Sequence, residues 1–132
     1  MTSARFPKRL KIYFDGGCRP NPGAMEAAVV ARGVVHISPT LGYGTNNDAE
    51  WLALILALEV ALKSGVDDFE LLGDSAVVVA QASRVWKCGS PDLQRHFDRF
   101  SAIVGTRKWP RVKKIARAQN LAGFALAQTH QR

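Results

Sequence analysis

The chain has 132 residues, of which 18 are Lys or Arg and 11 are Asp or Glu, so its formal net charge is +7. A hydrophobic content of 47% with 22% charged residues excludes a disordered or fibrous chain, and the length predicts one domain over 1–132 rather than two. The longest unbroken apolar run, Trp51–Leu58, is far shorter than the ~20 residues that a membrane helix needs.

The first third of the chain predicts three strands. Leu10–Asp15 alternates apolar and polar residues and stops at the turn-rich sequence GGCRPNPG, which we expect no strand to cross. Ala27–Arg32 and Val34–Ser38 follow, and Gly33 between them is typical of a hairpin.

The segment Asn46–Ser64 is the strongest helix prediction, because neither Gly nor Pro interrupts it and Gly65 ends it. Its Glu59 and Lys63 form an i,i+4 pair of the kind that faces solvent. Glu50 lies nine positions earlier, about 180° away around the helix. We therefore expect the carboxylate of Glu50 to point into the protein.

The second half of the chain alternates further strands and helices. Phe69–Gly73 predicts a short central strand that runs directly into Asp74. The remaining expected elements are a helix over Ala76–Ser83, a helix from Ser90 to about Val104, a strand over Val112–Ile115 and a helix over Ala118–Gln128. This order predicts an α/β fold with a mixed sheet.

Three features of the sequence bear on partners and compartment. Cys18 and Cys88 stand alone, which argues against a zinc site and fits two reduced thiols. The N-terminus shows no apolar signal core, so we expect a cytoplasmic protein. Five basic residues fall within Arg107–Lys114, and no acid follows Asp98. This segment is either a solvated basic surface or a phosphate-facing patch, and charge alone does not decide between them.

Three acids are the candidates for chemistry. Asp15 ends the first strand, Glu50 lies in the first turns of the long helix, and Asp74 ends the central strand. Asp15 and Asp74, taken singly, fit turn or cap residues. Together with an inward Glu50, three repelling carboxylates instead predict a divalent-metal site, and hard oxygen ligands favour Mg²⁺ or Mn²⁺ over zinc.

The three segments YFDGGCRPNPG, GTNNDAEWLALILAL and LLGDSAVVV, in this order, resemble the motifs of the ribonuclease H family, type 1, in its compact bacterial and archaeal form. The likeness spans Leu10 to Gln128. It implies the ribonuclease H-like fold, a five-stranded mixed sheet flanked by helices. It also implies a monomeric endonuclease that uses Mg²⁺ or Mn²⁺ to hydrolyse the RNA strand of RNA–DNA hybrids.

The resemblance assigns roles residue by residue. Asp15, Glu50 and Asp74 match the family's first three catalytic, metal-binding acids. Five further residues match positions that contact the hybrid through backbone amides and the minor groove, where 2′-hydroxyls are exposed: Gly16, Gly17, Cys18, Asn21 and Asn47.

The chain departs from the family pattern in its last helix. In RAQNLAGFALA the residue at the position of the fourth acid is Phe124, and another register would place Gln119 or Asn120 there. Losing this acid predicts a weaker second metal and reduced activity. The alternative function is a catalytically inactive module that binds hybrids.

Two other classes share features of this sequence. Sugar kinases and actin-like ATPases have a related sheet and a D-G start, but they close two domains on a nucleotide, and 132 residues supply one. The helix start GTNNDAE points away from Holliday-junction and transposase relatives.

Overall fold

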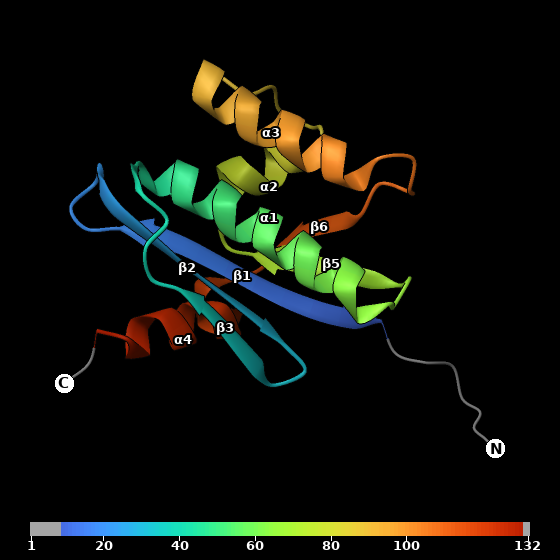
Figure 1. The fold of residues 1–132 in the computed structure, drawn as a ribbon, viewed down its shortest axis with the longest axis horizontal. Coiled ribbons are helices and arrows are strands. Elements are labelled where there is room, and N and C mark those ends of the chain that lie inside the picture. The colour runs from blue at the N-terminus through green and yellow to red at the C-terminus, as the bar shows by residue number, and fades with distance from the viewer. Residues whose placement is uncertain (1–8, 131–132) are drawn as a thin grey trace.

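The computed structural model describes residues 9–130, which form a mixed sheet with helices on both faces (Figure 1). The strands are β1 (Leu10–Cys18), β2 (Gly23–Ala31), β3 (Val34–Ser38), β4 (Tyr43–Gly44), β5 (Phe69–Gly73) and β6 (Arg111–Lys114). The helices are α1 (Asn46–Ser64), α2 (Ala76–Ala82), α3 (Pro91–Val104), the 3-10 turn η1 (Arg117–Gln119) and α4 (Leu121–Gln128).

The strands run in the order β3-β2-β1-β5-β6, and β4 pairs with β2 outside this path. β1 is antiparallel to β2, and the register places Asp15 opposite Ala28. β1 is parallel to β5, and β5 is parallel to β6. The predicted five-stranded mixed sheet is therefore confirmed, with the two-residue β4 as an addition. β1 and β5 run parallel and their pairing ends at Tyr13 and Leu72, so Asp15 and Asp74 each lie two residues beyond the last pair.

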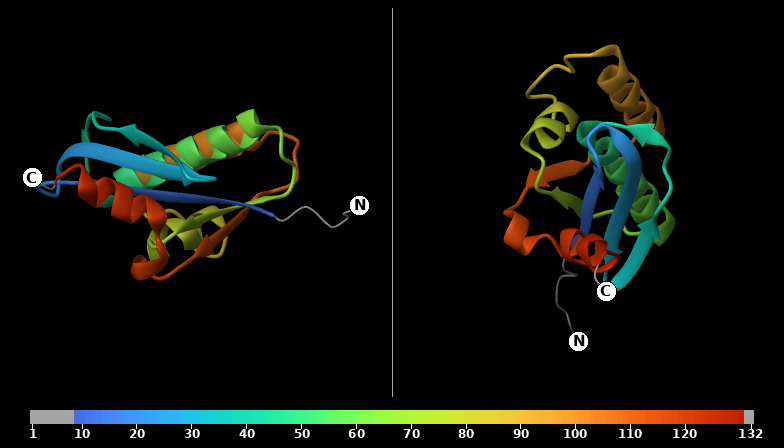
Figure 2. Two further views of the ribbon diagram at one scale, coloured as in Figure 1. Left: turned by 90° about the horizontal axis from the view of Figure 1, so that it is seen from below. Right: turned by 90° about the vertical axis from the view of Figure 1, so that its left-hand side faces the viewer.

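The helices divide unequally between the two faces of the sheet. α1 covers one face with α2 and α3 beyond it, and α4 covers the other face alone (Figures 1 and 2). On the α1 side the largest fully buried side chains include Trp51, Phe14 and Phe100. Trp51 meets the Phe100 ring edge-on at 5.9 Å between centroids, and its indole N–H donates to Gln81. A smaller apolar cluster, Ala28, Val30, Ala122 and Leu126, packs α4 against β2.

The start and end of α1 follow from its terminal residues. Thr45 and Asp48 form a reciprocal capping box, in which each side chain accepts from the backbone N–H of the other. Gly65 ends the helix in a left-handed conformation (φ 74°) that suits glycine.

The structure corrects the expectation for GGCRPNPG. β1 does not stop at Asp15 but continues through Gly16, Gly17 and Cys18, and β2 begins at Gly23 instead of Ala27. Both strands extend beyond Asp15, and their antiparallel pairing continues to Cys18, which lies opposite Met25. The turn is only four residues long.

The last helix is also shorter than predicted. The expected helix over Ala118–Gln128 is split into η1 and α4, because the side chain of Asn120 accepts from two amides of the next turn and so starts a new helix.

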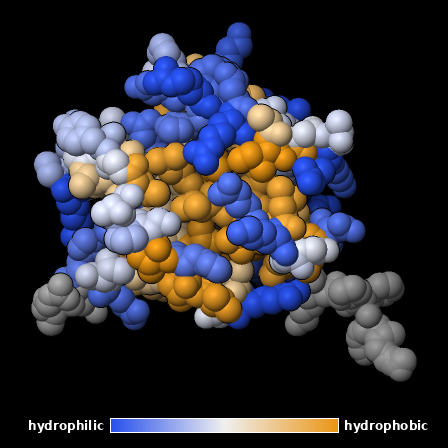
Figure 3. Space-filling model, viewed as in Figure 1, coloured by the Kyte–Doolittle hydropathy of each residue, from blue (hydrophilic) through white to orange (hydrophobic). Residues whose placement is uncertain are grey.

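Apolar side chains gather on the face shown in Figure 3, over α1 and the β3 edge. The outward stripe of α1 carries Leu52, Leu56 and Val60, which are half-buried, and Val34 on β3 is exposed. No helix within residues 9–130 has the length and apolar character needed to cross a membrane.

Candidate active site

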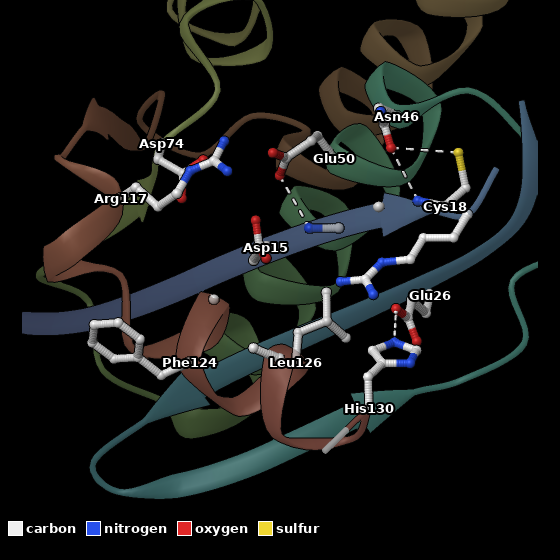
Figure 4. A pocket seen from close by; sticks show the side chains of 15 residues that line it. Asp15, Cys18, Glu26, Asn46, Glu50, Asp74, Arg117, Phe124, Leu126 and His130 are labelled. Carbon is white, nitrogen blue, oxygen red and sulfur yellow. Dashed lines mark hydrogen bonds and ion pairs between the residues drawn. The ribbon is translucent and has the colours of Figure 1, made fainter. Parts of the chain in front are cut away.

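Three segments bring their acids together just beyond the point where the pairing of β1 with β5 ends. Asp15 lies on β1, Asp74 follows β5 directly, and Glu50 projects from the first turns of α1 (Figure 4). One carboxylate oxygen from each lies within 4.8 Å of the others. The expected inward orientation of Glu50 is confirmed, since only 9% of this residue is exposed.

Gly16 allows α1 to approach β1 closely enough to deliver Glu50. A Cβ atom on Gly16 would lie 2.2 Å from the carbonyl oxygen of Ala49, so no other residue fits without moving the helix. The Gly16 amide donates to Oε1 of Glu50 at 3.1 Å. This glycine therefore positions a carboxylate.

The cluster holds protons in the absence of a cation. Burial and the neighbouring charge of Asp74 raise the pKa of Asp15 to about 7. Burial, followed by the charges of Asp15 and Asp74, raises the pKa of Glu50 to about 9. The guanidinium of Arg117 lowers both pKa values, which places a fixed positive charge beside the carboxylates. Three hard oxygen donors that repel one another at this spacing fit a divalent cation.

Asn120 connects the last helix to this cluster. It is fully buried, and its Nδ2 donates to Oδ2 of Asp74 at 2.9 Å and to the carbonyl oxygen of Phe14 at 3.0 Å. Its Oδ1 caps α4 by accepting from Ala122 and Gly123. Sequence reasoning missed this role, although an Asn before an apolar helical run is a helix-start signal.

The cluster lies in an open pocket of about 560 Å³. Of the five residues expected to contact the hybrid, Gly16, Gly17 and Cys18 line this pocket, while Asn21 and Asn47 lie outside its lining. Asn21 instead accepts from the backbone N–H of Asn46 at 3.1 Å.

Asn46 was missed in the sequence, and it organises the rim of the pocket. Its Oδ1 accepts from the backbone N–H of Cys18 at 3.0 Å and from the Cys18 thiol at 3.4 Å. The backbone amides of Gly16 and Cys18 therefore both donate within the protein, so any contact of these residues with a ligand involves other groups.

The basic stretch Arg107–Lys114 lies away from this pocket. Arg107 donates to the last carbonyls of α3, Arg111 pairs with Asp68 at 3.0 Å, and Lys113 pairs with Glu70 at 3.0 Å. These contacts favour the interpretation as a solvated, internally paired surface. The pocket instead takes its positive charge from Arg117 and Arg19.

Phe124, which the sequence predicts to stand in place of the fourth acid, borders the same pocket. Phe124 is 48% exposed, which excludes a role as a core residue, and its ring points away from the three carboxylates (Figure 4). Gly123 of α4 lies close to Asp15, and a Cβ added at Gly123 would be 3.7 Å from Oδ2 of Asp15. Thus Gly123, and not the Phe124 ring, is the part of this turn of α4 that is directed at Asp15.

The ribonuclease H-like class has a mixed sheet in this strand order, with two aspartates from neighbouring parallel strands and a glutamate from the helix that crosses them. The RNase H family model matches residues 7–130, and the chain belongs to this family.

Relatives and solved structures agree with the family. Ribonuclease HI of Halobacterium salinarum is 39% identical over 129 residues, which cover 90% of this chain and 62% of that protein. The crystal structure of RNase H1 from the same archaeon matches with a TM-score of 0.80 at 36% identity, over 90% of this chain and 94% of that one. LC11-RNase H1, isolated from compost and solved in complex with an RNA/DNA hybrid, matches with a TM-score of 0.78 at 34% identity, over 89% and 93% of the two chains. The chain thus spans less than two thirds of the length of the curated relatives that it matches.

Proposed function

We propose that this chain hydrolyses the RNA strand of RNA–DNA hybrids and uses Mg²⁺ or Mn²⁺ held by Asp15, Glu50 and Asp74. The observation that carries the proposal is the convergence of these three carboxylates within 4.8 Å in an open pocket of a ribonuclease H fold. The solved relative that binds an RNA/DNA hybrid supports the choice of substrate.

The residues of the pocket have different roles in the proposed reaction. A bound divalent cation supplies Lewis-acid stabilisation of the charge that develops on the phosphate. Gly16 and Asn120 hold Glu50 and Asp74 in place through the hydrogen bonds described above. Arg117 attracts the phosphate, because its guanidinium lies beside the carboxylates in the pocket lining. The rim formed by Gly17, Cys18 and Asn46 faces the exposed 2′-hydroxyl edge of the minor groove.

One observation favours a second candidate, a hybrid-binding module that does not cut. The last helix, α4, carries no Asp or Glu, and Phe124 stands where the family resemblance predicts the fourth acid.

The experiment that separates the two uses hybrids labelled on either strand, with Mg²⁺ and with Mn²⁺ in separate reactions. Cleavage of the RNA strand alone, lost in Asp15→Asn, supports the nuclease. Hybrid binding without cleavage in either ion supports the binding module and refutes the nuclease. Duplex DNA and duplex RNA are the matched substrates, and equal cleavage of all three would contradict the assigned specificity.

A further inference from the structure

The two edges of the sheet differ in the side chains that they carry. The edge strand β6 has three cations in four residues, Arg111, Lys113 and Lys114, and such charges commonly protect an edge against pairing with another chain. The opposite edge strand, β3, has the sequence VVHIS, and residues 33–47 contain no Lys, Arg, Asp or Glu. We propose that β3 pairs antiparallel with β3 of a second copy of this chain, which joins the two sheets into one. The family resemblance implies a monomer, so this inference goes beyond the proposed function.

The outer side of β3 is open to another strand. β3 pairs with β2 on one side, and no strand among the described residues lies on its other side (Figure 1). Val34 is 56% exposed and Val35 is 50% exposed, and Pro39 follows only after the strand has ended. Alternate residues of an edge strand direct their backbone N–H and C=O groups away from the sheet, where water or a further strand pairs with them.

Antiparallel pairing about His36 matches β3 with itself. With His36 opposite His36 of the second copy, all five residues of each strand are paired, and Val35 of each copy lies opposite Ile37 of the other. These two aliphatic side chains face α4, because their partners on β2, Val30 and Ala28, belong to the small apolar cluster under α4. Two copies therefore place four aliphatic side chains together as an extension of that cluster. Any other centre leaves part of each strand unpaired, so this register is favoured.

The charges along the β2–β3 hairpin permit this association, although each copy has a net charge of +7. Arg32 lies four positions before His36, so the two arginines of a dimer are about 27 Å apart along the paired strands. This separation exceeds the Debye length of ~8 Å at physiological ionic strength. β2 carries one charged residue, Glu26, which lines the acid pocket and is already paired with His130. The hairpin therefore adds little repulsion between the copies.

The pairing fixes how the two acid pockets are arranged. Residues opposite each other in antiparallel strands lie on the same side of a sheet, so the two-fold axis is perpendicular to the sheet and both α4 helices lie on one face. Asp15, Ala28 and Ile37 are in register across β1, β2 and β3. The two copies of Asp15 are therefore five strand spacings apart, about 24 Å across the sheet. No residue of β3 lines the pocket, so each site stays accessible.

The mass of the whole chain in solution, measured by sedimentation velocity over a range of concentrations, tests the inference. Five residues a side form a small interface, so we expect a dimer with a Kd on the order of 10 μM. Val35→Lys and Ile37→Glu should each raise this Kd roughly tenfold or more, because a charge replaces an aliphatic contact. Val85→Lys, at a valine that is 73% exposed outside the sheet, is the matched control and should leave the Kd unchanged. A parent that is monomeric at about one hundred times the expected Kd, or a dimer that neither edge variant weakens, overturns the inference.

A mixture of the two edge variants distinguishes a second copy from any other partner. In the proposed register the lysine of Val35→Lys lies opposite the glutamate of Ile37→Glu, so an equimolar mixture should recover the dimer as a one-to-one heterodimer. A mixture that stays monomeric while both variants melt at the parent temperature overturns the pairing. If either variant fails to fold, amide hydrogen exchange of the parent decides instead. Exchange at residues 34–38 should slow as the concentration rises, and exchange that does not change with concentration overturns the inference.

Discussion

Cation binding to Asp15, Glu50 and Asp74 should release protons, in a number that depends on pH. At pH 7 a carboxyl with a pKa of about 7 is half protonated, and one with a pKa of about 9 is almost fully protonated. Both must ionise to bind the cation, so roughly 1.5 protons leave at pH 7 and about one leaves at pH 8. Because each proton displaced changes the affinity about tenfold per pH unit, the apparent affinity should rise roughly 15- to 20-fold from pH 7 to pH 8.

Calorimetry in buffers of different ionisation enthalpy measures this proton release directly. Glu50→Gln is the informative variant, because Glu50 is not among the groups that shift Asp15. It should reduce the release at pH 7 to about half a proton, the share of Asp15 alone. In the metal-free protein, the raised pKa values also make the free energy of unfolding depend on pH. Two carboxyls with raised pKa values stabilise the fold at low pH, and this contribution is lost as pH rises toward 9. If the parent releases no protons on binding Mg²⁺ at pH 7, the carboxylates are already ionised and the argument from burial fails.

Three substitutions test the remaining parts of the site. Phe124→Asp should raise the rate of hybrid cleavage in Mg²⁺, by about 10²-fold if a well-placed second ion is worth about 3 kcal/mol. The substitution should lower the free energy of unfolding by at most ~1–2 kcal/mol, because the ring is half-exposed. A folded variant without a gain in rate would refute the alignment of Phe124 with the fourth acid. Gly16→Ala should destabilise the protein by roughly 1–3 kcal/mol in denaturant unfolding, because the methyl group would collide with the backbone of Ala49; a stability equal to the parent would show that α1 can move freely. Asn120→Ala removes the cap of α4 and leaves the buried carbonyl of Phe14 without its donor, so we expect a loss of roughly 2–4 kcal/mol; a smaller loss together with intact Mg²⁺ affinity would contradict its role in holding Asp74.

The part of the site that could be predicted is the part fixed by periodicity. Glu50 could be oriented because a helix turns by a constant angle, and the two aspartates could be placed because each ends an apolar run that predicts a strand. The three acids were therefore found together in the pocket, as expected.

The residues that were missed depend on pairings between distant segments. Glu26 reaches the pocket only through the register of β2 against β1, and no local pattern sets that register. Asn46 and Asn47 are adjacent asparagines, and the choice of Asn46 as the partner of Cys18 follows from where the capping box begins α1. Likewise, the glycines next to Asp15 are typical of a turn in the sequence. In the structure they belong to β1, where α1 approaches so closely that Gly16 leaves no room for a side chain.

Trp86 shows a further limit of pattern reading. A tryptophan between two helices of a small domain is normally expected to pack, yet this one is 54% exposed. Trp109 instead packs against the rings of Phe97 and Phe100 on α3. Aromatic composition alone does not indicate which ring enters the core.

The carboxylates of the cluster come from three segments that are 35 and 24 residues apart along the chain, at positions 15, 50 and 74. They meet only when β1 and β5 are paired and α1 has crossed over the sheet, so the unfolded chain holds no equivalent binding site. A cation therefore acts as a cross-link that exists in the native state alone, and at a concentration one hundred times its Kd it adds about 2.7 kcal/mol to the free energy of unfolding. Resistance of the chain to proteases should therefore rise with the concentration of the cation, independently of any reaction that the site performs.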